Sequence, residues 1–559
     1  MRIIINQEIY KTAILKESQV NFENYIRDIS QGYHKEFLLH PAFERNSIGS
    51  NLFNFFCYIQ MINLNENSLN NLNDCEYFKK IYYIKRYNNK ILKYIYALKV
   101  ISRGFFNIFY SFLRYIIILY KMKMRLGKLE FECANNIKYA IFTFIDEATL
   151  RDPFVDRYFP GICENDKIDK KSVLLISVFS SSIKKNECVK IIKKTFSNVA
   201  CPEQLVSYFD MMNLFFKYLK IILISCYRIV FIRKFSSIFD FIFLEELFLS
   251  TPNAEVCGEG IIKGMKKNLR TNEFKIFINS FENLEYEKRC IFAIRKYYPN
   301  CTCVGFQHAT LIDTQLSNFP LKEEIDNGLC PDVILSNGPK YLPILEDVFS
   351  NLFSKNIVKL APTLRYKKFT DEIVESSYFN FKYSLILSSI DPISSLKSIS
   401  YIAESIDSYD NSFGIIVRAH PMCNASILRD NFKKSGIKTE ISEKIIWIDA
   451  HCNLENLIYY ANYVFTYSTG SVLDILSLGK VPIVIGSNST QLTMVPFVDS
   501  KFSEFIKIVF NEDDVLSILK HFKLKKNLKK KIKEWYSEFY LDSRDCDLYD
   551  IFFSYIKDV

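Results

Sequence analysis

The chain lacks several patterns that mark other classes of protein. Its fifteen cysteines are scattered, and the pair Cys301 and Cys303 has neither zinc-finger spacing nor a second pair beside it, so we expect reduced thiols and no bound metal. Its apolar stretches fall short of the roughly 20 uninterrupted residues that span a bilayer. We detect no internal repeat. No recognised nucleic-acid motif accompanies the net charge of +10, which argues against a nucleic-acid enzyme.

What the chain does contain is enough apolar material for large cores. Hydrophobic residues make up 49% and aromatic residues 15% of its 559 residues, which excludes a disordered protein. This length exceeds one ordinary core, so we expect two or three domains. The apolar run Met1 to Asn6 is too short for the core of a signal peptide and reads as a first strand. The expected location is therefore the cytoplasm.

Strand and helix patterns alternate regularly from residue 139 onward. The predicted strands are 139–146, 172–180, 275–280, 302–307, 332–336, 383–390, 413–418, 437–441, 445–448, 464–467 and 481–485. We predict a first domain at 1–340 with an aromatic-rich helical insertion at about 20–135, a connection at 341–382 with two prolines, and a second domain at 383–559. The predicted fold is α/β, with two Rossmann-like domains facing a cleft.

Three segments bear on contact with a membrane. The stretches 104–120 and 219–232 are apolar but interrupted by charged residues, so we expect buried helices, with interfacial helices as the alternative. Residues 521–533 hold seven lysines, and Leu528, Ile532 and Trp535 recur at helical spacing. This predicts a basic amphipathic helix. It is either a solvated surface helix or a segment that adheres to the anionic inner face of the cytoplasmic membrane.

The most informative segment is 463–486, YVFTYSTGSVLDILSLGKVPIVIG, which reads as strand, polar turn, helix and strand. The turn contains four small residues that bring hydroxyl groups and free backbone N–H groups to the start of a helix: Ser468, Thr469, Gly470 and Ser471. Such a turn can bind one phosphate group. For this unit alone, an ordinary buried βαβ crossover is the alternative.

A second segment, 415–421 or IIVRAHP, ends a predicted strand with Arg418 and His420. Ligands of open parallel sheets bind beyond the carboxyl ends of the strands, so both residues are predicted to face the same crevice as the hydroxyl turn. An arginine can fork onto a phosphate, and a histidine can hydrogen-bond or protonate it. A lone strand-end histidine is more often structural, but this one of six histidines comes with an arginine and a phosphate turn.

Together these segments resemble the nucleotide-binding half of a GT-B glycosyltransferase. They are similar to the His-Pro and Ser-Thr motifs of bacterial sialyltransferases and polysialyltransferases. The resemblance implies a GT-B-like fold in which His420, Ser468 and Thr469 contact the phosphates of a nucleotide. It also implies that Asp474, at a position where related enzymes more often have Glu, binds the ribose hydroxyls.

The first half resembles bacterial surface-carbohydrate biosynthesis proteins, and the likeness runs from about residue 139 to 490. The matching segments are DRYFPG at 156–161, Glu-Asn at 282–283, a strand ending Gln-His at 307–308 and a Pro-Asp strand ending Asn-Gly at 331–338. Ala309 stands where relatives often have Gly or Ser.

In GT-B enzymes this half supplies the acceptor site and the catalytic base. The resemblance therefore implies Glu282 or His308 as the base, with Glu287 and Asp146 as further candidates. Acidic residues also crowd a helix start without any function, because the helix dipole favours them there.

The leading hypothesis is a glycosyltransferase that adds a sugar from a nucleotide donor to a growing capsule, O-antigen or related surface glycan. It would invert the anomeric centre and need no metal or cofactor. The preferred donor is a CMP-activated acidic sugar, such as a sialic-acid-like nonulosonate or Kdo. Expected partners are the nucleotide sugar, a glycan or lipid-linked acceptor and an anionic membrane, but no nucleic acid. The alternatives are an epimerase of the UDP-GlcNAc 2-epimerase type and a non-catalytic subunit for polysaccharide assembly.

Overall fold

The computed structural model describes residues 13–555 with internal gaps. The gaps are 31–33, 44–55, 57–89, 128, 130, 132–133, 146–153, 163–165, 180–184, 270–273, 312–315, 351, 354–356, 365–368, 371–377, 390–391, 421–422, 424, 435–438, 450–451, 468, 487–501 and 523–525. The strand predicted at residues 1–6 and the candidate residues Asp146 and Ser468 lie outside the described residues.

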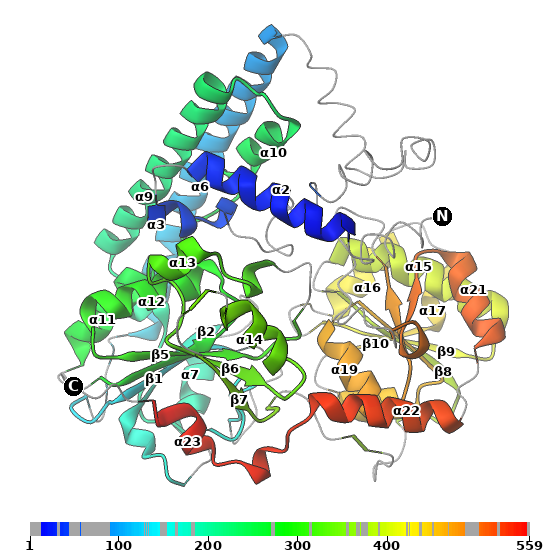
Figure 1. The fold of residues 1–559 in the computed structure, drawn as a ribbon. Helices are drawn as coiled ribbons and strands as arrows, with labels where there is room; N and C mark the ends of the chain where they lie inside the picture. The colour runs from blue at the N-terminus through cyan, green and yellow to red at the C-terminus, as the bar shows by residue number, and fades with distance from the viewer. Residues whose placement is uncertain are drawn as a thin grey trace.

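The first domain is built on a sheet of seven parallel strands in the order β3-β2-β1-β4-β5-β6-β7 (Figure 1). Strands β1 and β2 have every residue buried or nearly so, as expected for a parallel sheet covered by helices on both faces. The bounds are β1 Tyr139–Ile145, β2 Val173–Phe179, β3 Val199–Ala200, β4 Ile276–Ser280, β5 Thr302–Gln307, β6 Val333–Asn337 and β7 Val358–Ala361.

The second domain is built on six parallel strands in the order β10-β9-β8-β11-β12-β13. The order reverses direction at β8, where β9 lies on one side and β11 on the other. That reversal is the point where open α/β sheets bind ligands. The bounds are β8 Tyr383–Leu387, β9 Gly414–Arg418, β10 Ile445–Ile448, β11 Tyr463–Thr466, β12 Pro482–Ile485 and β13 Lys507–Val509.

Helices cover both sheets and add a separate layer to the first domain. In that domain they are α2 Ala13–Ser30, α3 His34–Leu38, α6 Lys90–Leu126, α7 Lys185–Lys193, α8 Pro202–Leu205, α9 Tyr208–Tyr227, a π-helical continuation η5 Arg228–Arg233, α10 Ile238–Glu246, α11 Gly258–Asn268, α12 Glu285–Tyr297, α13 Lys322–Asp326 and α14 Leu342–Ser350. The rest are α15 Pro392–Tyr409, α16 Ala425–Lys434, α17 Thr439–Lys444, α18 Leu454–Tyr460, α19 Thr469–Ser477, α20 Phe502–Phe505, α21 Glu512–His521, α22 Lys526–Tyr536 and α23 Leu548–Phe553.

Two of the predicted domain boundaries need correction. Strand β7 falls within the predicted connection 341–382, yet it pairs with β6 and belongs to the first sheet. Only its two end residues are buried, so the strand carries no apolar run that a sequence pattern would detect. At the other end, α23 returns to the first domain, where Phe552 and Phe553 join a core cluster with Tyr139 of β1.

The predicted strand at 437–441 is wrong for residues 439–441, while 437 and 438 lie outside the described residues. Residues 439–441 lie in helix α17, where Ile441 is buried against the second sheet. Ile441 is therefore a buried position on a short helix. Strands β3 and β13, which are two and three residues long, escaped prediction.

The predicted helical insertion is present as α2, α3 and α6, and the segment between β3 and β4 adds α8 to α11. Helices α6 and α9 run side by side and extend away from the first sheet (Figure 1). The expectation of buried helices is wrong for α6, because only 17% of its most apolar window is buried. Of the described helices, α6 alone is long and apolar enough to span a membrane by length and composition.

The basic helix α22 uses its apolar stripe inside the protein. Ile532 and Trp535 are 0% and 1% exposed, and Leu528 packs beside them against the cluster that includes Leu473 and Leu476 of α19. The structure thus favours the simpler interpretation of this segment, a helix with a solvated lysine face. Adhesion of α22 to a membrane would have to rely on its lysines alone.

Candidate active site at the carboxyl ends of both sheets

In the second domain the Arg-Ala-His motif and the hydroxyl turn follow strands that end at the same edge of the sheet. Strand β9 ends at Arg418 and β11 ends at Thr466, with only β8 between them. Strands in a sheet lie about 4.8 Å apart, so the two ends are roughly 10 Å apart. The structure therefore brings Arg418 and His420 to the same edge as the start of α19, as the sequence predicts.

Hydrogen bonds from neighbouring strands hold the Arg-Ala-His segment in place. The His420 N–H donates to Ser388 Oγ at 2.8 Å, and the Ala419 N–H donates to the carbonyl of Ile448 at 3.0 Å. Ser388 follows directly after β8 and is buried. Ser388 is not predictable as a site residue, because nothing in the sequence of a single strand shows which neighbouring backbone N–H its hydroxyl accepts from.

Arg418 is a perturbed charge at this edge. Burial lowers the pKa of its guanidinium, and the positive charge of Arg157 lowers it further, while Asp474 acts in the opposite direction. Asp474 is on α19, whereas Arg157 belongs to the first domain, in the loop after β1. Arg157 therefore lies close enough to Arg418, across the boundary between the two domains, to affect its pKa.

The hydroxyl turn begins helix α19, as predicted. The helix starts at Thr469, Gly470 is buried and Ser471 is half-buried. A nine-residue helix presents unpaired backbone N–H groups and the positive end of its dipole at this point. These groups suit a phosphate group of the kind that helix starts bind in other proteins.

In the first domain the two leading base candidates are in contact. Glu282 follows β4 and His308 follows β5, and these strands are neighbours in the sheet. His308 Nε2 lies 3.2 Å from Glu282 Oε1, and both side chains are largely buried, with 5% and 19% exposure. A carboxylate this close orients an imidazole and stabilises its protonated form, which is the arrangement that general-base catalysis uses.

The backbone beside this pair is held in an unusual conformation. Asn283 has φ +55, in the left-handed region that asparagine tolerates better than most residues. Its side-chain amide donates to Glu324 Oε2 at 3.1 Å. Such a conformation persists only where the surroundings enforce it, and this one directly follows Glu282.

Glu287 does not act as a second base beside Glu282 and His308. Its role is to hold the backbone around Glu282 by hydrogen bonds. Its carboxylate accepts hydrogen bonds from the backbone N–H groups of Glu282 and Leu284 and from Ser280 Oγ, at 3.0, 3.1 and 2.7 Å. Burial, and next the charge of Glu282, raise its pKa from 4.5 to about 8. A largely neutral Glu287 leaves the negative charge of this region on Glu282.

The loop after β1 completes the first-domain side of the site. Asp156 is buried, and its Oδ1 accepts hydrogen bonds from Thr143 Oγ1 at 3.1 Å and from the N–H groups of Tyr158 and Phe159 at 2.7 and 3.0 Å. The Tyr158 ring meets the His308 ring edge to face, with centroids 4.5 Å apart. This turn places Arg157 at the site.

The Gln-His and Asn-Gly motifs of the first half lock two strand ends together. Gln307 Oε1 accepts a hydrogen bond from the Asn337 N–H at 3.0 Å, and the Asn337 amide donates to the His308 carbonyl at 3.3 Å. The role of Gln307 and Asn337 is thus to position His308. Ala309 is tolerated in the turn, where its carbonyl accepts from the Gln307 amide.

No group of three or more His, Cys, Asp or Glu side chains that could hold a metal ion occurs among the described residues. The sequence contains one Asp-x-Asp spacing, at Asp545 and Asp547. Asp547 caps α23 by accepting from the N–H groups of Tyr549 and Asp550, and it pairs with Lys167. This spacing therefore has a structural explanation.

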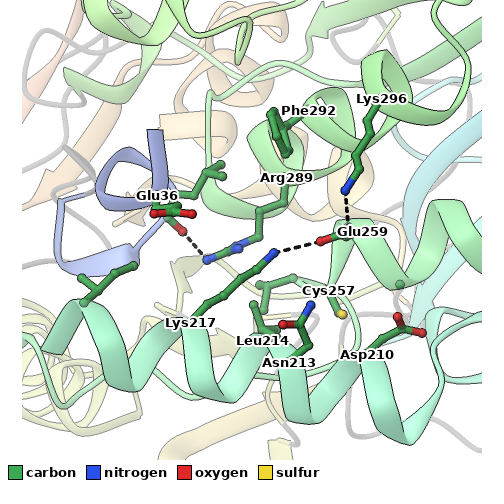
Figure 2. A pocket seen from close by; sticks show the side chains of 15 residues that line it. Glu36, Asp210, Asn213, Leu214, Lys217, Cys257, Glu259, Arg289, Phe292 and Lys296 are labelled. Atoms are coloured by element: carbon green, nitrogen blue, oxygen red, sulfur yellow. Dashed lines mark hydrogen bonds and ion pairs between the residues drawn. The ribbon is translucent and has the colours of Figure 1, made fainter. Parts of the chain in front are cut away.

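A pocket between α9, α11 and α12 is built from charged residues but lies apart from the strand ends (Figure 2). Glu259 lies at its centre and binds Lys217 at 2.8 Å and Lys296 at 2.9 Å. Arg289, on its wall, pairs with Glu285 at 2.7 Å. The charges of this pocket are used within the protein, so it does not compete with the strand-end site.

The sequence matches no protein-family description and no curated protein. Distant similarity to solved structures covers most of the chain. Staphylococcus aureus MnaA with UDP is 13% identical with a TM-score of 0.43, over 73% of this chain and 93% of that one. The glycotransferase of kitacinnamycin is 9% identical, with a TM-score of 0.39 over 74% and 98% of the two chains. Methanocaldococcus jannaschii UDP-GlcNAc 2-epimerase with UDP-GlcNAc and UDP is 12% identical, with a TM-score of 0.36 over 71% and 99%.

Similarity at this distance transfers no substrate to this chain. The architecture rests on the chain's own topology: two parallel α/β sheets and a C-terminal helix, α23, that crosses back to the first domain. This is a GT-B-like fold with a helical addition, and it confirms the predicted fold class.

Proposed function

We propose that this chain is a glycosyltransferase that uses a nucleotide sugar as donor. The observation that carries the proposal is the position of two complementary sets of groups. Glu282 and His308 end adjacent strands of the first sheet, while Arg418 and His420 end a strand of the second, beside the start of α19. Arg157 connects the two sets through its effect on Arg418.

In the proposed reaction the acceptor hydroxyl attacks the anomeric carbon of the donor sugar. The Glu282–His308 pair takes the hydroxyl proton as the new C–O bond forms. The bond between the sugar and the nucleotide phosphate breaks, and the phosphate leaves with the electron pair. Arg418, His420 and the N-terminus of α19 stabilise its negative charge. A single displacement of this kind inverts the anomeric centre, and these groups suffice without a metal.

The preferred donor remains a CMP-activated acidic sugar, transferred to a capsule, O-antigen or related surface glycan. Two arginines, Arg157 and Arg418, lie near each other at this site, and the charge of Asp474 acts on Arg418. That balance suits a donor with more than one anionic group, such as a phosphate and a sugar carboxylate. Asp474 is the proposed partner of the ribose hydroxyls, and Thr469 and Ser471 of the phosphate.

The first experiment measures binding by thermal stabilisation with CMP, CDP, UDP and GDP. A nucleotide that binds only the folded chain raises the unfolding midpoint by mass action. We expect one base to stabilise the wild type and not His420→Ala. The control is His521→Ala, which alters an exposed histidine at the end of α21 and should keep the shift. If none of the four nucleotides stabilises the wild type, the donor site is refuted and the non-catalytic subunit becomes the better hypothesis.

The second experiment separates transfer from epimerisation. The matching nucleotide sugar is incubated with and without a glycan acceptor, and products are followed by mass spectrometry. Transfer should require the acceptor and be lost in Glu282→Gln, while nucleotide binding by that variant is retained. Conversion of the free nucleotide sugar into an epimer without acceptor would instead establish the sugar-nucleotide epimerase.

A further inference from the structure

Helix α6 carries two apolar stripes, of which only one is used inside the protein. The inner stripe faces α9, α10 and the segment after α10. Gly104, on this side, lets the helix approach the ring of Phe248, which a Cβ would strike. The inner stripe consists of Ala97, Gly104, Ile108, Phe112 and Leu119, all buried.

The outer stripe faces solvent and repeats at intervals of three or four residues, apart from one interval of eight between Leu98 and Phe106. With 3.6 residues per turn, such intervals place side chains on one face. Its members are between 46% and 71% exposed, namely Ile91, Ile95, Leu98, Phe106, Phe109, Leu113, Ile117, Tyr120 and Met124. A globular helix normally has one such stripe, and among the described residues no element covers most of the second, which makes it a candidate binding surface.

Helix α9 adds a parallel row to this surface. The helices are antiparallel: Lys123 lies over the ring of Tyr208, and Phe112 stacks on Phe215 with centroids 4.1 Å apart. The exposed row of α9 and η5 consists of Phe209, Met212, Phe216, Leu223, Tyr227 and Phe231, between 38% and 76% exposed.

On each of the two helices, the residues that contact the other helix lie between the buried row and the exposed row. Phe109, for example, is 46% exposed and touches the buried Phe215, whose neighbour Phe216 is 57% exposed. Because the buried rows share the core side of that contact, the exposed rows share the outer side. The two rows form one face, which we term the α6–α9 apolar surface. Figure 1 shows the two helices that carry it, side by side.

This surface is larger than monomeric proteins usually expose. Fifteen large side chains contribute to it, each between 38% and 76% exposed. At the sizes typical of aromatic and long aliphatic side chains, they present on the order of 1,000 Å². A helix of 37 residues is about 55 Å long, which suits an extended partner better than a small ligand.

The charge pattern identifies the chemistry of the partner. Helix α6 holds eight Lys or Arg residues and no Asp or Glu. At 3.6 residues per turn, the exposed bases fall along one edge of the outer stripe, namely Lys99, Arg103, Arg114, Lys121 and Arg125. An apolar stripe with a basic edge is typical of helices that lie in the interface of a membrane with anionic lipids.

We propose that the α6–α9 apolar surface binds an anionic lipid bilayer, with both helices lying in the interface plane. The apolar rows enter the boundary between headgroups and acyl chains, and the basic edge contacts the phosphate groups. The lysines of α22 play no part in this binding, since that helix buries its own apolar stripe. The inference is independent of the donor chemistry, and a lipid-linked acceptor would be found at such a surface.

The test is flotation of the full chain with vesicles of phosphatidylcholine alone or mixed with phosphatidylglycerol. We expect binding to the mixed vesicles and weaker binding at high salt. One triple variant removes bases from α6: Arg103→Gln, Arg114→Gln and Lys121→Gln. Each base contributes about 1 kcal/mol at an anionic surface, so this variant should bind roughly 100-fold more weakly. The matched control removes three bases from α22: Lys530→Gln, Lys531→Gln and Lys533→Gln, and should bind like the wild type.

A second triple variant removes apolar contact and leaves the charge unchanged: Phe106→Gln, Leu113→Gln and Ile117→Gln. These side chains are exposed, so circular dichroism and the unfolding midpoint should match the wild type, while vesicle binding is lost. The proposal is overturned if the wild type does not bind the mixed vesicles, or if the α22 variant loses binding as much as the α6 base variant. A dimer by light scattering that the apolar variant dissociates, without vesicle binding, would assign the surface to a second copy of the chain. Resistance to alkaline extraction from vesicles would overturn the in-plane arrangement in favour of a spanning α6.

Discussion

The carboxyl group of Glu287 should make the protein less stable as the pH rises, and Glu287→Gln should abolish that dependence. Glu287 is 1% exposed and lies beneath the candidate base pair. Burial, with the charge of Glu282 second, raises its pKa from 4.5 to about 8. A carboxyl group that binds its proton more tightly in the folded than in the unfolded chain favours folding at low pH. That contribution is complete below about pH 4.5 and is lost as the pH rises through about 8.

The size of the effect follows from the shift. At 1.36 kcal/mol per pKa unit, a change from 4.5 to about 8 corresponds to about 5 kcal/mol. Relaxation around a buried charge lowers such values, so we expect the free energy of unfolding to lose about 2 to 5 kcal/mol through this group. The loss is confined to the interval between the two pKa values.

Urea denaturation of the wild type and Glu287→Gln at about pH 5 and about pH 9 measures this difference. The free energy of unfolding of the variant, relative to that of the wild type, should be at least about 2 kcal/mol higher at about pH 9 than at about pH 5. A difference that is the same at both pH values, or that moves in favour of the wild type at high pH, would refute the reasoning. Glu282→Gln supplies an internal check: removing the neighbouring charge should move the transition of the Glu287 carboxyl to lower pH.

Two further changes test the site and the junction of the domains. Arg418→Lys keeps the charge but loses the planar fork that matches a phosphate, so the nucleotide affinity should fall about tenfold or more by calorimetry, and unchanged affinity would remove Arg418 from the site. Gly338→Ala introduces a Cβ at φ +96 that would strike the carbonyl oxygen of Phe539, in the segment that follows α22. The expected cost is about 3 kcal/mol in urea denaturation, and a stability equal to that of the wild type would contradict this account of the junction.

Most strands were predictable because a parallel sheet covered on both faces needs continuous apolar runs. The predicted strand 302–307 coincides with β5, and every residue of β5 is buried. Strand β7 escaped because it ends the first sheet as an edge strand with two of its four residues exposed. The predicted end of the first domain at residue 340 is therefore too early, because α14 and β7 follow it and still belong to that domain.

The sequence predicts which candidate residues lie at strand ends, but it does not predict which of their side chains touch. Glu282 and His308 were each identified as candidates, and only the order of the strands shows that β4 and β5 are neighbours and that the two side chains touch. Arg157 was quoted only as part of a motif, with no role assigned. Its position depends on the turn that Asp156 builds, and its effect on Arg418 depends on how the two domains pack.

Helix α6 shows the limit of hydropathy as a guide to burial. Its apolar content was read correctly, but the average over a window does not separate a helix with one wide buried face from a helix with two opposed stripes. Splitting its apolar positions by their angle around the axis recovers an inner row through Gly104 and Ile108 and an outer row through Phe106 and Leu113. Only the packing of α9 and Phe248 shows which row is inside. The same helix thus encodes both a core contact and an exposed apolar surface. The absence of acidic residues from α6 is the feature of its sequence that favours a lipid surface over a protein partner.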